Sequence, residues 1–316
     1  MSIESNVAEL AAADKVLTDG GIETWIDYKS DYKLTEVGTV GMLDTGAGRA
    51  LLVELESRYI NAAVEYDLPI VIGTPSWHGA DHRLQAAGLP SSAVERLNRS
   101  AVWLTRGLRR QIADGHGYVA GVMGPFGDGY DPGAALDAAT AQRTHRRQAD
   151  ALAAAGADFL FAVPLPAVSE AVGICQAMAA TGAAYVPSFL LNESGRLPDG
   201  TALGEAIGRV LDEVERAPLH ISISCLHPRV FVTAFNNATD LPGAENLSLV
   251  AELKANASDR SRAELSESTE LHADPPEDWA AQMMIARETA QLRIVGGCCG
   301  TDEAHIAALA RLLSNA

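Results

Sequence analysis

Residues 136–163 read LDAATAQRTHRRQADALAAAGADFLFAV, and this stretch contains the unit from which most of the chain is built. Segment 136–156 is amphipathic and rich in alanine, which favours a helix, whereas Phe159–Val163 is a short apolar run of strand length. A helix next to a fully apolar strand is typical of proteins in which helices cover a parallel sheet. The stretch therefore predicts a parallel α/β fold.

The same pairing of strand and helix recurs along the chain. The strand candidates are Val16–Thr18, Ile70–Gly73, Tyr118–Met123, Phe159–Val163, Tyr185–Leu190, His220–Ser224, Leu249–Leu253 and Leu292–Val295. Helices are expected near 51–67, 91–114, 136–156, 168–181, 201–216, 229–236, 277–291 and 302–314. Eight repeats fit a closed barrel better than an open sheet. We therefore expect an α/β protein with a single (β/α)8 TIM barrel domain spanning residues 1–316.

Two connections are unusually long, namely 22–50 after the first strand and 257–278 after the seventh. Because the loops that follow strands build the active face of a (β/α)8 barrel, both are candidates for lids. Segment 257–278 is also acidic, so a solvated surface loop is an equal alternative for it. The least certain element is the sixth helix, 229–236, which is short and lies in an Asn-rich stretch.

The charge balance argues against several classes of partner. There are 24 Lys and Arg against 41 Asp and Glu, so the net charge is −17 at neutral pH. Such a protein repels phosphate backbones and anionic lipids, which disfavours nucleic acid and membrane partners. The sequence shows neither a signal peptide nor the ~20 apolar residues of a membrane helix. We expect a cytoplasmic protein with small-molecule partners, and a homo-oligomer stays open.

The strongest local signal is IVGGCCGT at 294–301, a strand end followed by two adjacent cysteines and a helix. Adjacent cysteines do not easily form a relaxed disulfide with each other, but both thiols can bind one metal ion. Cys225 closes the sixth strand, and strand ends of a barrel point toward a common centre. Cys225, Cys298 and Cys299 are thus candidate ligands of a zinc ion with an open fourth position. Simple packing of buried cysteines is an equal alternative.

Two further residues near these motifs have a simpler interpretation. Cys175 lies in the apolar helical run VGICQAMAA and is expected in the core. His227 follows Cys225 by two positions and precedes a proline. We expect it to line the site or to cap the next helix rather than to bind the metal.

Two other strand ends carry candidate substrate-binding residues. The sequence DGGIET at 19–24 places a carboxylate and two glycines on the expected active face, where Asp19 is suited to an ammonium group. In GTPSW at 73–77, Thr74 and Ser76 offer hydroxyls and Trp77 offers an aromatic wall. Both stretches are also compatible with ordinary turns between a strand and a loop.

Together these motifs resemble those of the homocysteine S-methyltransferases, (β/α)8 barrels that transfer a methyl group to a thiol through zinc. The matching stretches are DGGIET at 19–24, GPFGDGY at 124–130, Cys225 at a strand end, KANAS at 254–258 and GGCCGT at 296–301. The resemblance implies that Cys225, Cys298 and Cys299 bind zinc and that no other catalytic residue is needed. It also makes Asp19 the substrate-binding aspartate. Together with the strand-end motifs, the candidate substrate-binding residues are Asp19, Gly20, Glu23, Thr24, Thr74, Ser76 and Asn256.

The chain departs from the family pattern in two places. Relatives usually carry a glutamate near the end of strand four that helps to bind the homocysteine ammonium group, and here Ala162 stands at the expected position. Many relatives also have asparagine where Ser224 precedes Cys225. Both changes leave the metal ligands intact and bear on the identity of the acceptor. Glu23 in the first loop is a candidate replacement for the missing carboxylate.

The expected reaction is methyl transfer from a small sulfonium or ammonium donor to a thiol, with homocysteine giving methionine. S-methylmethionine, S-adenosylmethionine and betaine-like donors are all compatible, because an acidic protein attracts cations whose charge is lost in the transition state. Two alternatives stay open. One is a zinc hydrolase or lyase, although three thiolates weaken the metal as a Lewis acid. The other is a catalytically lapsed barrel that binds an amino acid or senses redox state through its cysteines.

Overall fold

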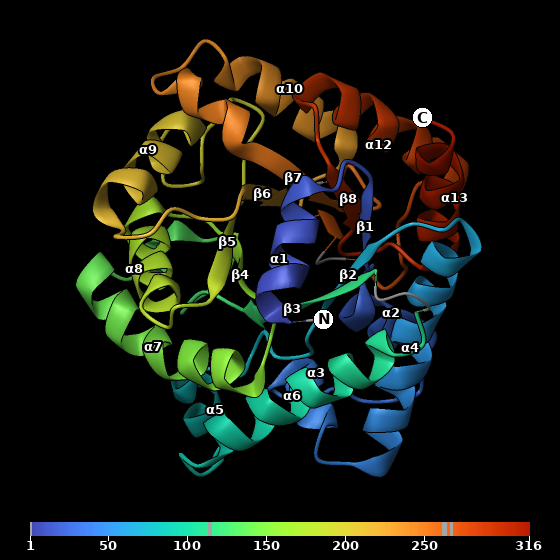
Figure 1. The fold of residues 1–316 in the computed structure, drawn as a ribbon, viewed down its shortest axis with the longest axis vertical. Helices are drawn as coiled ribbons and strands as arrows, with labels where there is room; N and C mark the ends of the chain where they lie inside the picture. The colour runs from blue at the N-terminus through green and yellow to red at the C-terminus, as the bar shows by residue number, and fades with distance from the viewer. Residues whose placement is uncertain (1, 113–115, 261–263, 266–267) are drawn as a thin grey trace.

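The computed structural model describes residues 2–112, 116–260, 264–265 and 268–316. Within these residues, eight parallel strands pair in the order β1-β2-β3-β4-β5-β6-β7-β8, and β8 pairs with β1 to close a barrel. Figure 1 shows the helices as an outer ring around these strands. The prediction of a (β/α)8 TIM barrel is confirmed. No helix in the described part of the chain combines the length and apolar character needed to span a bilayer.

The observed strand boundaries all lie within two residues of the predicted ones. The strands are β1 Val16–Thr18, β2 Ile70–Gly73, β3 Gly117–Met123, β4 Phe159–Leu165, β5 Ala184–Phe189, β6 Ile221–Ser224, β7 Val250–Ala255 and β8 Ile294–Gly297. The α-helices are α1 Ile3–Ala12, α2 Ile22–Lys29, α3 Gly38–Met42, α4 Gly46–Glu65, α5 Asp81–Ala86, α6 Ala93–Arg109, α7 Ala138–Ala155, α8 Val168–Ala179, α9 Leu203–Glu213, α10 Pro228–Ala238, α12 Pro276–Ala290 and α13 Glu303–Ser314. Two 3-10 helices, η2 Pro132–Ala134 and η3 Ala244–Leu249, lie in connections.

Some helical boundaries differ from the prediction. Helix α4 begins at Gly46 rather than near 51, because the Thr45 side chain caps it by accepting a hydrogen bond from Gly48 N at 3.0 Å. Helix α6 ends at Arg109, and residues 113–114 of its predicted range lie outside the described residues.

The two lid candidates differ in structure. Segment 22–50 contains α2 and α3, whose Ile26 and Val40 pack against α6 in an apolar cluster separate from the main core. In segment 257–278, residues 261–263 and 266–267 lie outside the described residues. The described part of that segment borders a cavity at the carboxyl ends of the strands.

The amino-terminal helix α1, which the repeat pattern did not predict, closes the barrel at the end where the strands begin. Figure 1 shows it crossing the middle of the ring of helices. Leu10 is buried and clusters with Val16, Tyr118 and Phe159 inside the barrel. Asn6 donates a hydrogen bond to Asp158 at 2.8 Å, immediately before β4. The interior is therefore filled at this end, and the cavities described below lie at the opposite end.

Asp158 links helix α1 to the barrel. Its contribution to the stability of the protein can be tested by substitution. Its carboxylate accepts hydrogen bonds from Asn6 at 2.8 Å, Arg109 at 2.9 Å and Val119 N at 2.8 Å. Asp158→Ala leaves buried donors unpaired and should lower the free energy of unfolding, measured in urea, by about 3 kcal/mol.

The matched control is Asp150→Ala, which removes an exposed carboxylate that pairs with Arg146 on α7. Exposed pairs of this kind contribute about 0.5 kcal/mol or less, so this variant should unfold like the wild type. Equal effects of the two substitutions would contradict the role given to Asp158.

Candidate functional site

The two adjacent cysteines follow β8 directly, in a loop that its neighbours hold in place. Gly296 approaches β1 so closely that a Cβ at this position would lie 2.1 Å from Thr18 Oγ1, so a larger residue does not fit. Cys298 N donates to Ala255 O at 2.8 Å, and Thr301 Oγ1 donates to Cys298 O at 2.7 Å. These bonds hold the loop, which connects β8 to α13, against β7.

Cys225 follows β6 in a backbone conformation that is uncommon for a residue with a side chain. Its φ is 65°, in the left-handed region. Two hydrogen bonds hold it there, from Cys225 N to Lys254 O at 3.1 Å and from Asn256 Nδ2 to Cys225 O at 2.9 Å. The turn brings the Cys225 Sγ to 3.3 Å from the Cys298 Sγ, and both cysteines are free. Two strand ends distant in sequence thus meet at these thiols.

Cys299 is the most exposed of these thiols and interacts with Thr24 of α2. Among the residues that the structure describes, no three His, Cys, Asp or Glu side chains are arranged as a preformed metal site. The hydrogen bond with Cys225 raises the pKa of the Cys298 thiol above its usual range. A cation beside the thiols would have the opposite effect, because it stabilises thiolates.

The three cysteines lie between two cavities at the carboxyl ends of the strands. The inner cavity, within the barrel mouth, is lined by residues that include Asp19, Glu56, Phe161, Lys254, Cys298 and Cys299. The outer cavity lies among the loops and is lined by residues that include Tyr130, Cys225, His227, Asn256 and Cys299. Thr24 and Cys299 line both. Ligands in the two cavities would therefore meet at the cysteines.

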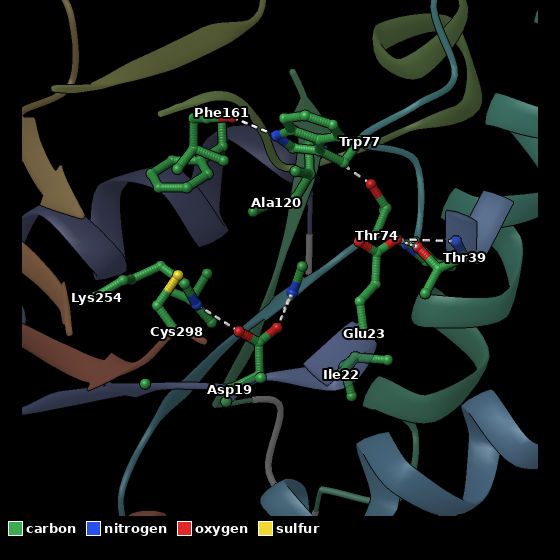
Figure 2. Close-up of a pocket in the computed structure, with 18 of the residues that line it drawn as sticks. Asp19, Ile22, Glu23, Thr39, Thr74, Trp77, Ala120, Phe161, Lys254 and Cys298 are labelled. Atoms are coloured by element: carbon green, nitrogen blue, oxygen red, sulfur yellow. Dashed lines mark hydrogen bonds and ion pairs between the residues drawn. The ribbon is translucent and has the colours of Figure 1, made fainter. Parts of the chain in front are cut away.

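An ion pair lies at the inner cavity. Figure 2 shows Lys254 and Asp19 pointing toward one another beside Cys298, and their charged atoms are in contact. Asp19 also accepts a hydrogen bond from Gly73 N at 2.5 Å, and Lys254 donates to Thr18 Oγ1 at 2.9 Å. Burial by itself would lower the pKa of Lys254, but the charge of Asp19 raises it above the usual value. The lysine therefore stays charged and remains paired with the carboxylate of Asp19.

Comparison with known proteins assigns the chain to a family. The family model for homocysteine S-methyltransferase matches residues 16–313. The chain belongs to the homocysteine S-methyltransferase family. It is a methyltransferase, and the family acts on thiols, as the sequence motifs implied. A curated homocysteine S-methyltransferase of Escherichia coli K12 is 27% identical over 314 residues, which cover 96% of each chain.

Solved structures show the same fold. The metallated form of the homocysteine methyltransferase MmuM from Escherichia coli has a TM-score of 0.77 at 24% identity, and the match covers 96% of this chain and 98% of that chain. Its apo form has a TM-score of 0.67 at 24% identity and covers 94% of this chain and 95% of that chain.

The substrate-binding residues that the sequence suggested fall in different places in this methyltransferase. Asp19, Gly20, Glu23 and Thr74 line the inner cavity, Asn256 lines the outer cavity, and Thr24 lines both. Ser76 lines neither of these cavities, because its hydroxyl donates to Val122 O at 2.7 Å. The Thr74 hydroxyl lies 2.6 Å from that of Ser76 and accepts from Val122 N at 2.9 Å. Both hydroxyls thus connect β2 to β3.

Glu23, the candidate replacement for the strand-four carboxylate, already has partners within the protein. Its Oε1 accepts hydrogen bonds from the N and Oγ1 of Thr39 at 3.0 and 3.1 Å, as Figure 2 shows. The Nδ1 of His78 lies 3.8 Å from the same oxygen. Glu23 therefore connects α2 to α3 in addition to lining the cavity.

The strand-four position needs a correction. Ala162, which the sequence comparison placed where relatives carry glutamate, packs in the core between the barrel and the helices. The residues of β4 that face the inner cavity are its two neighbours, Phe161 and Val163, because side chains alternate along a strand. The Val163 carbonyl accepts a hydrogen bond from Trp77 Nε1 at 2.5 Å. Val163 and Phe161 of β4 thus give the cavity an apolar wall and no carboxylate.

The remaining sequence assignments can be placed directly. His227 lines the outer cavity and also caps α10, where its Nδ1 accepts a hydrogen bond from Arg229 N at 3.2 Å. Cys175 is fully buried in α8, as expected for a core residue.

Sequence reasoning missed three ionisable residues of the inner cavity, Lys254, Glu252 and Glu56, although each leaves a signal. Lys254 alternates with Glu252 in the otherwise apolar strand VAELKA, so both side chains lie on the inner face. Glu56 lies on the apolar face of α4 that carries Leu52 and Tyr59. A charged residue on a buried face is the feature that should have been noted in each case.

Because Asp19 and Lys254 form an ion pair, substitutions of the two residues should have strongly non-additive effects on the free energy of unfolding. Lys254→Met leaves the Asp19 carboxylate without its cation and should lower the free energy of unfolding by about 3–5 kcal/mol. The double variant with Asp19→Asn should recover most of this loss, because asparagine still accepts the hydrogen bond from Gly73 N. Urea unfolding of the wild type, both single variants and the double variant measures the coupling. Simple addition of the single effects would contradict it.

Proposed function

We propose that this methyltransferase binds zinc through Cys225, Cys298 and Cys299 and transfers a methyl group to homocysteine, giving methionine. The observation that carries the proposal is that the cysteines lie between two cavities, because methyl transfer requires a thiol and a donor to meet at one point. The names of the related proteins agree with this choice, since the curated relative is a homocysteine S-methyltransferase and one form of MmuM is metallated.

The three cysteine thiols are suitable ligands for zinc. Thiolate ligands bind zinc at about 2.3 Å, and a tetrahedral arrangement then places two sulfurs about 3.8 Å apart. The Sγ atoms of Cys225 and Cys298 are 3.3 Å apart, which a small movement converts to that spacing. Cys299, the next residue in the chain, supplies the third thiol. Three protein ligands leave one position for a substrate, as is typical of catalytic rather than structural zinc.

Zinc held there would supply a position at which the acceptor thiol is deprotonated at neutral pH. The residues of the inner cavity then orient the acceptor. Phe161 and Val163 provide apolar contacts for its carbon chain, and the charged groups near Asp19 and Lys254 receive its polar end. Its sulfur faces Cys298 and, beyond it, the outer cavity.

The donor occupies the outer cavity in this proposal. Its lining includes the carboxylates of Glu193, Asp259 and Glu270 against one arginine, Arg260, which favours a cationic ligand. The acceptor thiolate attacks the methyl carbon, and the bond from that carbon to the sulfur or nitrogen of the donor breaks. The bonding electrons stay on that sulfur or nitrogen atom, which thereby loses its positive charge. The demethylated donor then leaves. S-methylmethionine, S-adenosylmethionine and betaine-like molecules all meet this description.

The zinc assignment predicts a metal content that depends on individual cysteines. Wild-type protein purified under reducing conditions should contain about one zinc per chain. Cys225→Ala or Cys298→Ala should remove most of this zinc, as measured by elemental mass spectrometry. Cys175→Ala is the control, because Cys175 is buried in α8 and should not affect zinc content. Zinc retained by the Cys298 variant, or absent from the wild type, would contradict the assignment.

The reaction is tested with donors that carry a labelled methyl group. Zinc-loaded protein, homocysteine and either labelled S-methylmethionine, S-adenosylmethionine or betaine should give labelled methionine with at least one donor. Cys298→Ala should lower the rate about a hundredfold or more, because the thiol then lacks a cation that stabilises its thiolate. Absence of transfer to homocysteine from every donor would show that the proposed acceptor is wrong.

A further inference from the structure

Glu56 has a carboxyl group that is not fully hydrogen-bonded by the described residues. It lies on α4, its side chain is only 3% exposed, and it lines the inner cavity with Asp19 and Lys254. Among the described residues, its Oε2 atom is buried and has no hydrogen-bond partner. A buried polar atom without a partner lowers stability, so its presence at a cavity points to a ligand.

Lys254, the lysine that lines the same cavity, forms hydrogen bonds with residues other than Glu56. It donates to Asp19 and to Thr18. Burial and the negative charge of Asp19 raise the pKa of Glu56 well above its usual value, and Lys254 offsets only part of this effect. A second positive charge in the cavity would favour the ionised form.

The other carboxylates of the inner cavity have partners within the protein. Asp19 pairs with Lys254, and Glu252 lies 2.8 Å from His220. Glu23 accepts its hydrogen bonds from Thr39. Within the described part of the cavity wall, Lys254 is the single lysine or arginine. Glu56 is therefore the carboxyl of the described cavity wall that keeps a buried oxygen without a partner.

We propose that Glu56 binds the ammonium group of the thiol acceptor and thereby selects amino-acid thiols over thiols that lack an amino group. The proposal rests on the proposed function, which puts the acceptor sulfur at Cys298 in the same cavity. An ammonium group is a suitable ligand because it carries a positive charge and three hydrogen-bond donors. The carboxylate comes from helix α4, since β4 presents Val163 and Phe161 to this cavity.

The experiment compares two thiols that differ only in the amino group, homocysteine and 4-mercaptobutanoate. Isothermal calorimetry measures their dissociation constants for zinc-loaded wild type and Glu56→Gln. The glutamine keeps the size of the side chain and removes the charge. The control is Glu54→Gln on the same helix, because Glu54 is exposed and pairs with Arg58.

The wild type and the control should prefer homocysteine. Glu56→Gln should weaken homocysteine binding about tenfold to a hundredfold, the effect of losing a hydrogen bond to a charged group, and should leave 4-mercaptobutanoate binding unchanged. If Glu56→Gln keeps the preference, or weakens both thiols equally, the assignment of Glu56 is overturned while thiol binding stands. If the wild type binds neither thiol, the proposed function fails and the assignment fails with it.

Thermal unfolding without ligand separates a binding role from a structural one. Because Glu56 Oε2 has no partner in the described structure, Glu56→Gln should keep or raise the unfolding midpoint. A lower midpoint would show that the carboxyl supports the fold, which would overturn the proposal. Glu56→Met, which removes the polar group, should likewise keep or raise the midpoint and lose the preference for homocysteine.

Discussion

The pairing of β8 with β7 on one side and β1 on the other is the interaction on which the site depends. In this register, Gly296 lies between Lys254 of β7 and Thr18 of β1. Because Gly296 has no side chain, Lys254 can extend past it to Thr18 and Asp19, and the same strand delivers Cys298 to the barrel mouth. A single closure contact therefore joins the first strand, the seventh strand and the cysteine loop. A side chain at Gly296 would separate all of them.

The two ends of the barrel differ in how their features affect stability. At the amino-terminal end, Leu10 fills the interior and Asp158 accepts hydrogen bonds from three elements, and both features favour folding. At the carboxyl end, Cys225 has a left-handed backbone and Glu56 has a buried atom without a partner. Such features lower stability and persist where the rest of the fold is strong enough to hold them. The closed end thus supports the irregular geometry of the open end.

The sequence predicted the barrel because each strand of a parallel sheet is an apolar run, which can be recognised without knowing the strands that it pairs with. It also predicted which cysteines follow strands, since Cys225 and Cys298 each end an apolar run. Helix α1 was missed because it precedes the first repeat and has no strand before it. Ala162 was placed wrongly because β4 is apolar on both faces, so that only the structure shows which residues point inward. The pairing of Lys254 with Asp19 depends on the register of three strands, and the packing of Glu56 depends on the rotation of α4 about its axis. Neither is encoded by local pattern alone.

Thr24 and Cys299 form a wall that belongs to both cavities. A ligand in either cavity therefore touches part of the surface that binds the other ligand. Under the proposed function, acceptor and donor would not bind independently. Any factor by which the first changes the affinity of the second must equal the factor in the reverse direction, because the two binding equilibria share one thermodynamic cycle. If the proposed function holds, the shared wall would make the acceptor and the donor each other's effectors, without a separate regulatory site.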